Sequence, residues 1–416
     1  MKPATSPLHR RSFTPEARPP LADLRVVDLS RLVAGNMVSL QLADQGAEVI
    51  KIEDPKVGDP LRAWRTKGLS LHWKVYARNK KSLAINLRPQ AGRDVLLDLI
   101  ATADILIENY RPGTLEEMGL GPQVLHARNP GLIIVRITGF GQDGPYRDRP
   151  GFGTLVEAMS GFAAKNGFGD RPPVLPPLAM ADMISGLYGA YAIMIALRVV
   201  ERGGPKGGRG QIIDLPLLEP MVSVLGPEAA MYRVSGEKPK RTGSRSLTTS
   251  PRNVYETADG RFIAISASIQ QMAERVFRAI GKPEMIDDPR FRTNTDRVRN
   301  IDACDGAVAD FIRARPLAEN MAIFEAAEVT AIPVYEIDQL IDDPHVQERG
   351  VLVEAPDDEA GSVLMHNIIP RLSETPGQLR FAAPVLGQHT RSILESIGCD
   401  PVRIAALAAD GVIKEA

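Results

Sequence analysis

The stretch Leu24-Arg25-Val26-Val27-Asp28-Leu29 is a short, mostly apolar run that predicts a buried parallel strand. Helix-like apolar spacing follows from Ala34 to Ala43, and Gly46 stands where such a helix would end. The next run, Glu48-Val49-Ile50-Lys51-Ile52-Glu53, is again strand-like. A strand, a helix and a second strand in this order predict one βαβ unit, the building block of parallel sheets.

The same alternation continues through the first half of the chain. Further strand-like runs are Ser82–Leu87, Ile105–Glu108, Leu132–Thr138 and Gln211–Leu215, and Ala91–Ala101 has the spacing of a helix. Strands separated by helices of this length predict an α/β fold with a Rossmann-like parallel sheet. Such sheets bind ligands outside the carboxyl ends of their strands. We therefore expect the walls of a site in the loops Ser30–Asn36, Asn109–Thr114 and Gly139–Gly153.

The second half of the chain has a different pattern. Two strand-like runs flank Asp259-Gly260, which is a strong hairpin signal. Helix-like segments follow at Gln270–Ile280, Ile301–Arg313 and Leu317–Ala327, and together these elements predict a smaller α+β domain. The predicted organisation is a disordered tail over residues 1–20, a large domain over 21–220, a small domain over 235–335 and a return to the large domain over 345–416.

Composition limits the partners and the cellular location. The 416 residues carry 50 basic and 51 acidic side chains, for a net charge of −1, whereas nucleic-acid-binding proteins normally show a basic excess. No apolar run reaches the roughly 18 residues of a membrane span without interruption, and Ile184 to Val200 is predicted to be a buried helix. The first 20 residues contain no apolar segment typical of a secretory signal. We therefore expect a cytoplasmic protein that binds neither nucleic acid nor a membrane.

Two common nucleotide-binding motifs are incomplete. The loop Ser30–Asn36 has one glycine where the dinucleotide motif GxGxxG needs three. Gly203–Gly210 lacks the Lys-Ser/Thr pair of a P-loop, and its place between a helix and a strand is typical of a connecting turn. Cys304 and Cys399 lie far apart, without companion residues at metal-ligand spacing. The sequence thus predicts neither a nucleoside triphosphate site nor a metal site.

Asp182 is the most informative single residue. It directly precedes an apolar segment of helix length, Met183 to Val200. An aspartate in this position usually caps the helix by accepting a hydrogen bond from a free backbone N–H. The start of a buried helix would also suit a nucleophilic carboxylate. The local sequence leaves both interpretations open.

Several strings between about Leu21 and Gly398 form a recognisable series. They are Val26–Ser30 with Ala34-Gly35, Leu42–Glu53, Arg78–Ser82, Glu108–Gly113, Ile137–Tyr146, Gly207–Gln211 and Gly387–Arg391. In order and spacing they resemble the class III coenzyme A transferases, the CaiB/BaiF family that includes formyl-CoA transferase and carnitine CoA-transferase. The resemblance extends over nearly the whole chain.

The resemblance implies an activity and a mechanism. In this family the aspartate after an Ala-Met-Ala-like tract, here Asp182, attacks an acyl-CoA thioester and forms an acyl–aspartyl anhydride. CoA then returns to the aspartyl group and passes to a second acid. The implied partners are coenzyme A as co-substrate, an acyl-CoA donor and a small carboxylic acid acceptor. Exchange of one thioester for another requires no ATP. Family members also form homodimers of interlocked, ring-like chains.

The resemblance also implies which residues contact CoA. They are Val33, Ala34, Asn86, Leu87, Arg88, Asn109, Tyr110, Arg111, Arg149 and Phe152. Arginine suits the phosphates of CoA because it forms charge-assisted hydrogen bonds. Each arginine could equally be a solvated surface charge, and the two aromatic residues could belong to the core. The sequence does not identify the acyl donor or acceptor. Dicarboxylates such as succinate, mesaconate or glutarate are candidates, because Arg62, Arg65 and the region of Arg245 could pair with a second carboxylate. Oxalate, formate and carnitine derivatives stay open.

The chain departs from the family pattern at two positions near the expected site. Asn36 replaces a proline, and Gly153 replaces an acidic residue that many transferases carry after the aromatic position. A related enzyme, α-methylacyl-CoA racemase, needs two bases and typically has a histidine where this chain has Phe152. Phenylalanine cannot exchange a proton, so racemisation is the less favoured alternative. A protein that binds acyl-CoA without turnover is the third possibility.

Overall fold

The computed structural model describes residues 8–203 and 208–416, so part of the segment Gly203–Gly210 lies outside the described residues. The chain forms two compact units. The first unit runs to Phe162, continues over Leu175–Pro227 and ends with Pro344–Ala416. The second unit contains Ala163–Val174 and Glu228–Asp343. The segment from Ala163 to Val174 thus belongs to the second unit, although the sequence pattern had assigned it to the large domain.

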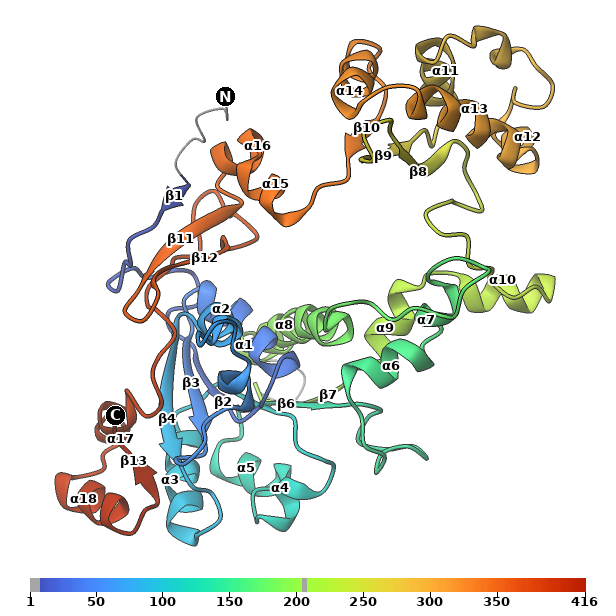
Figure 1. The fold of residues 1–416 in the computed structure, drawn as a ribbon. Coiled ribbons are helices and arrows are strands. Elements are labelled where there is room, and N and C mark those ends of the chain that lie inside the picture. Colours follow the sequence, from blue (N-terminus) through green and yellow to red (C-terminus); the bar gives the residue numbers. More distant parts are fainter. Residues whose placement is uncertain (1–7, 204–207) are drawn as a thin grey trace. The chain divides into compact units, whose positions relative to one another are not determined.

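A seven-stranded sheet forms the centre of the first unit (Figure 1). Its strands are β2 (Arg25–Asp28), β3 (Glu48–Glu53), β4 (Lys80–Ile85), β5 (Ile105–Glu108), β6 (Ile133–Thr138), β7 (Ile212–Pro216) and β13 (Ile413–Lys414). They lie in the order β13-β4-β3-β2-β5-β6-β7, and every pair is parallel except β13 with β4. For the six parallel strands this is the 3-2-1-4-5-6 order of a doubly wound sheet. The strand order reverses between β2 and β5, where such folds open a crevice for ligands.

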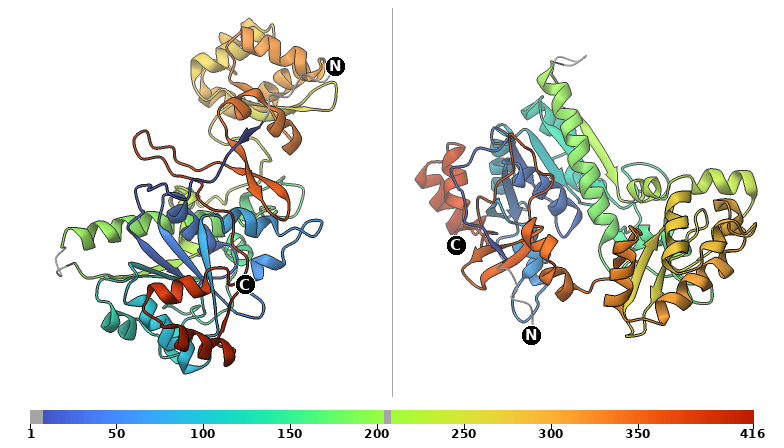
Figure 2. Two further views of the ribbon diagram at one scale, coloured as in Figure 1. Left: turned by 90° about the vertical axis from the view of Figure 1, so that its left-hand side faces the viewer. Right: turned by 90° about the horizontal axis from the view of Figure 1, so that it is seen from above.

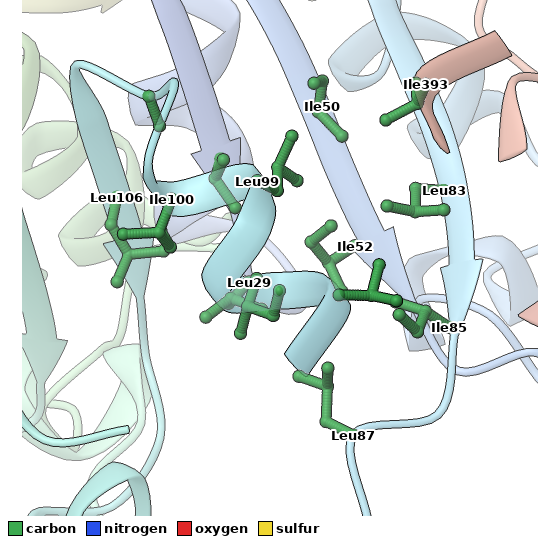
Figure 3. Packing of buried hydrophobic residues seen from close by; sticks show 14 of the residues in the cluster. Leu29, Ile50, Ile52, Leu83, Ile85, Leu87, Leu99, Ile100, Leu106 and Ile393 are labelled. Atoms are coloured by element: carbon green, nitrogen blue, oxygen red, sulfur yellow. The ribbon is translucent and has the colours of Figure 1, made fainter. Parts of the chain in front are cut away.

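Helices cover both faces of this sheet (Figures 1 and 2). One face carries α1 (Ala34–Asp44), α6 (Gly153–Met159), α8 (Met180–Glu201) and α9 (Leu218–Val224). The other face carries α3 (Gln90–Ile100), α4 (Thr114–Glu117), α5 (Pro122–Arg128), α17 (Thr390–Ser396) and α18 (Pro401–Ala409). Figure 3 shows Leu99 and Ile100 of α3 among strand residues such as Ile50 and Leu106. The mixed α/β fold that the strand–helix alternation predicted is confirmed.

Glycines allow α8 to approach α1 closely. A Cβ atom at Gly186 would lie 2.4 Å from the side chain of Met37, and one at Gly189 would lie 2.7 Å from that of Val38. Larger residues at these two positions would force the helices apart. The contact therefore fixes the first turn of α8, which contains Asp182, relative to the N-terminus of α1.

Residues 8–20 are ordered, so the prediction of a disordered tail is wrong for them. β1 (His9–Arg10) pairs in parallel with β11 (Leu352–Asp357), which pairs antiparallel with β12 (Gly361–His366). The separation along the chain explains the error, because Arg10 and its partner Glu354 are 344 positions apart. Composition within a short window cannot reveal such a pairing. Two further short helices of this unit are α2 (Leu71–Tyr76) and α16 (Pro344–Glu348).

The second unit contains a three-stranded antiparallel sheet in the order β10-β9-β8. The strands are β8 (Arg252–Glu256), β9 (Phe262–Ser266) and β10 (Ala331–Pro333), and β8 and β9 form the predicted hairpin. Helices α10 (Glu228–Ser235), α11 (Gln270–Ala279), α12 (Asn294–Arg299), α13 (Ile301–Arg313), α14 (Leu317–Ala326) and α15 (Ile337–Asp342) belong to this unit. Its core joins one face of the sheet to α11, α13 and α14, in yellow to orange in Figure 2. Helix α7 (Phe162–Lys165) begins at the boundary of the two units.

By length and composition alone, α8 could cross a membrane. The core helices of soluble proteins pass the same test. One side of α8 is buried against α1 and the sheet, including Ala181, Ile193 and Leu197. The other side exposes the apolar residues Leu187, Tyr188, Tyr191, Met194, Ile195 and Val199. The prediction of a buried helix is therefore right for one side of α8 only.

Candidate active site

Asp182 is not the N-cap of α8. The helix begins at Met180 rather than at Met183, so its N-cap is Ala179, which has no capping side chain. Asp182 lies inside the first turn and is half-buried. The backbone N–H groups of Asp182 itself and of Ala34, the first residue of α1, lie near its carboxylate and favour the ionised form, which lowers its pKa. The N-termini of two helices thus meet at this carboxylate, and each presents the positive end of its dipole.

Fully buried charged side chains form hydrogen bonds with the backbone of the loop before α1, at Ser30 and Leu32. Lys51 on β3 donates to the backbone oxygen of Ser30 and lies 3.2 Å from Asp28 Oδ1 and 3.3 Å from Asp59 Oδ2. Asp59 accepts from the backbone N–H of Leu32 at 3.1 Å. Burial works against a charged Lys51, but Asp28 and Asp59 outweigh it and raise the pKa of the lysine. Because the backbone of this loop is held at two points, the N–H of Ala34 has a fixed direction.

Asn36, which replaces the family's proline, is part of the same network. Its Nδ2 donates to Leu32 O at 2.6 Å and to Asp59 Oδ2 at 2.9 Å. Its Oδ1 accepts from Lys80 Nζ at 3.0 Å, and Lys80 also donates to Ser39 Oγ at 2.7 Å. Burial lowers the pKa of Lys80 to about 7. A proline would restrict the backbone at this position, whereas Asn36 holds the loop through specific hydrogen bonds of its side chain.

A pocket of about 400 Å³ opens at the carboxyl ends of β2, β5 and β6. Six of the predicted CoA-contacting residues line it together with Asp182, namely Ala34, Asn109, Tyr110, Arg111, Arg149 and Phe152. All three loops that we expected to form the walls contribute to it. Residues that the sequence did not single out are Arg31, Leu32, Pro60, Pro112, Ile137, Thr138, Gly139, Arg147, Pro150, Gly151 and Leu217. Most of these lie in the predicted loops, whereas Pro60 and Leu217 had no sequence signal.

The strand-order reversal brings two of the loops together. Asn109, which follows β5, accepts from Arg31 N at 2.9 Å and donates to Arg31 O at 2.8 Å. The guanidinium of Arg31 lies 5.4 Å from the centre of the Tyr110 ring. Tyr110 is therefore neither a free surface ring nor only a core residue, since it both packs against the core and lines the pocket.

Four arginines line the pocket and give it a positive character: Arg31, Arg111, Arg147 and Arg149. Arg149 stacks on Tyr146 with its guanidinium carbon 3.6 Å from the ring centre, which limits the orientations of its side chain. A cationic pocket beside a carboxylate suits an anionic substrate that carries an electrophilic carbon. No group of three or more His, Cys, Asp or Glu side chains that could hold a metal ion occurs in the part of the chain that the structure describes.

The remaining predicted residues lie elsewhere. Val33 is buried in a small cluster with Leu61 and Trp73, and Leu87 belongs to the core below the sheet. Asn86 accepts from Arg88 N at 3.0 Å in the loop after β4. Their contacts with CoA stay a prediction, because the pocket does not include them.

The arginines proposed for a second carboxylate already have partners. Arg62 forms two hydrogen bonds with Glu53, at 2.7 and 2.8 Å. Arg65 donates to a backbone oxygen, and Arg245 pairs with Asp302 and Asp305 in the second unit. In this conformation the arginines of the pocket are better placed for this role.

Gly153 explains one departure from the family. A Cβ atom at this position would stand 2.4 Å from Asp182 Oδ2, well inside contact distance. An acidic side chain at residue 153 therefore has no room while Asp182 keeps this conformation. Glycine lets the start of α6 lie directly against the carboxylate and exclude water from that side.

Burial raises the pKa of Asp182 to about 6, and the charge of Glu157 acts in the same direction. Only the ionised carboxylate can act as a nucleophile. We therefore expect kcat/KM to fall about tenfold per pH unit below a midpoint near 6. Initial rates of the catalysed reaction between about pH 4.5 and about pH 8.5 measure this limb. A limb near the usual aspartate value of about 4 would contradict the assignment.

The chain was compared with known proteins. It matches CoA-transferase family III over residues 21–390. It is 39% identical to the succinyl-CoA–D-citramalate CoA-transferase of Chloroflexus aurantiacus, over 95% of this chain and 98% of that protein. It is 34% identical to the succinyl-CoA:glutarate CoA-transferase of Mus musculus, over 95% of this chain and 91% of that one. The crystal structure of a CaiB/BaiF family protein from Brucella suis superposes with a TM-score of 0.80 at 32% identity, covering 92% of this chain and all of the other.

The doubly wound sheet and the cationic pocket at its strand-order reversal define an α/β enzyme for anionic substrates. The match along the sequence specifies the class further. The chain belongs to CoA-transferase family III, and it is a CoA-transferase that uses CoA thioesters as substrates.

Proposed function

We propose that this enzyme transfers CoA from succinyl-CoA to a small dicarboxylic acid through an anhydride on Asp182. Two relatives that match nearly the whole chain are named for succinyl-CoA and for the acceptors D-citramalate and glutarate. Succinyl-CoA keeps a free carboxylate beyond its thioester, and both named acceptors are dicarboxylic acids. The arginines around the pocket supply cations for such groups.

The proposed reaction begins with attack of the Asp182 carboxylate on the thioester carbonyl carbon. The carbon–sulfur bond breaks, CoA leaves as the thiolate, and a mixed anhydride forms. The thiolate then attacks the aspartyl carbonyl carbon, succinate leaves as the carboxylate, and CoA is held as an aspartyl thioester. The acceptor carboxylate attacks this thioester and releases the thiolate again. Attack of the thiolate on the acceptor's acyl carbon frees Asp182 and yields the new CoA thioester.

The surroundings of Asp182 favour each of these steps. The N–H of Ala34 can hold an oxyanion that forms on the reacting carbonyl, because it lies beside this carboxylate and favours negative charge there. Gly153 and the half-buried position limit access of water, which would hydrolyse an anhydride. No net proton is gained or lost, and one thioester replaces another, so the cycle requires no phosphoryl donor.

The placement of Asp182 within the arginine-lined pocket is the single observation that carries this proposal. Trapping with hydroxylamine tests it. Enzyme incubated with succinyl-CoA and hydroxylamine should become inactive, and peptide mass spectrometry should find a hydroxamate at Asp182. Enzyme treated with hydroxylamine alone should stay active. Inactivation without succinyl-CoA, or a hydroxamate at another residue, would disprove the covalent role.

Two alternatives predict different products. A racemase would scramble the α-carbon of a branched acyl-CoA, but Phe152 in the pocket supplies no second base. A protein that only binds acyl-CoA would form no new thioester. Incubation of succinyl-CoA with a panel of carboxylic acids, followed by mass spectrometry of the CoA esters, separates the three possibilities.

We also propose that the enzyme is an interlocked homodimer of ring-like chains in the cytoplasm. The exposed apolar side chains of α8, among them Leu187, Tyr191 and Ile195, would be covered by a second copy of the chain. This covering would also account for the apolar character of the helix without a membrane. Sedimentation at the mass of a single chain would contradict the dimer.

A further inference from the structure

Glu157 is a buried carboxylate that the reaction scheme above does not use. Its side chain is 2% exposed, and it lies on α6, one helical turn after Gly153. Residues separated by one turn share a face of a helix. The face of α6 that places Gly153 against the Asp182 carboxylate therefore also directs Glu157 toward the first turn of α8.

Glu157 provides the side-chain cap that the N-terminus of α8 lacks. The N-cap residue Ala179 has no side chain that could accept from the free N–H groups of the first turn. Glu157 Oε1 accepts from Ala181 N at 3.0 Å, across 24 residues of chain. A cap from another helix fixes the backbone next to Asp182 and also fixes the distance between the two carboxylates.

The charge of Glu157 is not neutralised by a partner. Among residues 8–203 and 208–416, no basic side chain forms an ion pair with it, and the one hydrogen bond of its carboxylate is with the backbone N–H of Ala181. Burial is the main cause of the raised pKa of Asp182, and the negative charge of Glu157 is the next. The other charged groups on the surrounding elements are Arg31, Arg111, Arg147 and Arg149 along the pocket, the exposed Glu219 on α9, Arg198 and Glu201 at the far end of α8, and Asp44 at the far end of α1, paired with Arg78.

We propose that Glu157 is a positioning residue that drives acylation of Asp182: it holds the first turn of α8 and repels the ionised nucleophile but not the acylated one. This inference rests on the proposed anhydride mechanism. The attack converts a negatively charged Asp182 into a neutral anhydride, and the charge leaves with the CoA thiolate. Repulsion between the two carboxylates is therefore relieved as the anhydride forms, and the equilibrium shifts toward the acylated enzyme.

The substitution Glu157→Gln tests this role, because it removes the charge and keeps an oxygen that can accept from Ala181. Three measurements follow: the acid limb of kcat/KM, the amount of succinate released in a burst when enzyme meets succinyl-CoA without an acceptor, and the thermal midpoint. We expect the acid limb to move to lower pH and the burst to shrink about threefold or more, while the thermal midpoint stays close to that of the wild type. A merely structural role would change the thermal midpoint and leave the acid limb in place.

Two further variants serve as controls. Glu157→Asp keeps the charge and weakens the cap, so its acid limb should stay near that of the wild type even if its thermal midpoint falls. Glu219→Gln removes an exposed carboxylate of α9 and should change neither limb nor burst. The proposal would be overturned if Glu157→Gln had the same acid limb of kcat/KM and the same burst as the wild type. It would also be overturned if the acid limb of Glu157→Asp moved to lower pH. Absence of a burst in the wild type would instead contradict the anhydride mechanism itself, so the two failures are distinguishable.

Discussion

Asn in place of Asp182 is expected to lower CoA transfer by at least about a thousandfold. The amide has nearly the same shape as the carboxylate, so it can occupy the same place beside Gly153 and Ala34. It is not a nucleophile for a thioester, however, and the oxygen atom that should carry the acyl group is lost. Steady-state transfer from succinyl-CoA, with the new CoA ester quantified by mass spectrometry, measures the effect. Residual turnover above about a thousandth of the wild-type rate would argue against a covalent intermediate.

The stability of this variant provides an internal control. The folded-state pKa of Asp182 is raised to about 6, so ionisation of this group disfavours the folded state at neutral pH. This effect shrinks as the pH falls below about 6 and vanishes only below the unfolded value of about 4, and it is absent from the asparagine variant at all pH values. Asp182→Asn should therefore be at least as stable as the wild type in thermal unfolding at pH 7.5. A matched substitution, Asp338→Asn in the exposed first turn of α15, should leave transfer unchanged.

The large sheet could be predicted because its strands are buried on both faces. Such strands consist of continuous apolar runs, and the runs at Glu48–Glu53 and Ile105–Glu108 match β3 and β5. The site loops could be predicted for a related reason, since the carboxyl ends of parallel strands meet at one edge of a sheet. These two rules placed the pocket without any knowledge of side-chain contacts.

Features that depend on distant partners could not be predicted. The start of α8 was placed at Met183 because an aspartate before an apolar run is normally a cap, whereas here Glu157 accepts from Ala181 in its place. Lysine is rarely fully buried, and only the folded chain reveals that Lys51 and Lys80 are. Their burial depends on Asp28, Asp59 and Asn36, which come from three different segments.

Lys51→Met is therefore expected to produce the largest loss of stability, about 3–5 kcal/mol, because it leaves Asp59 buried without its cation and Asp28 with only Lys80, 3.9 Å away. The deficit should shrink as the pH falls, since protonation removes the unpaired charges. Transfer should fall as well, because the loop around Ser30 loses its anchor and the N–H of Ala34 is no longer directed at Asp182. Denaturant unfolding at about pH 7.5 and about pH 5.5 measures the first two effects.

Lys81→Met on β4 is the matched control, because Lys81 also pairs with a carboxylate but is 36% exposed. A solvated pair of this kind contributes about 0–1 kcal/mol, so the control should unfold close to the wild type. Equal losses in the two variants would mean that the buried pair is worth no more than a surface pair. A different outcome is that Lys51→Met is as stable as the wild type but loses CoA transfer. In that case the contacts of Lys51 with Asp28, Asp59 and Ser30 would affect only the geometry of the loop before α1. We expect that Lys51→Met alone loses both stability and CoA transfer. This result would mean that the buried cation Lys51 stabilises the fold and also aligns the nucleophile.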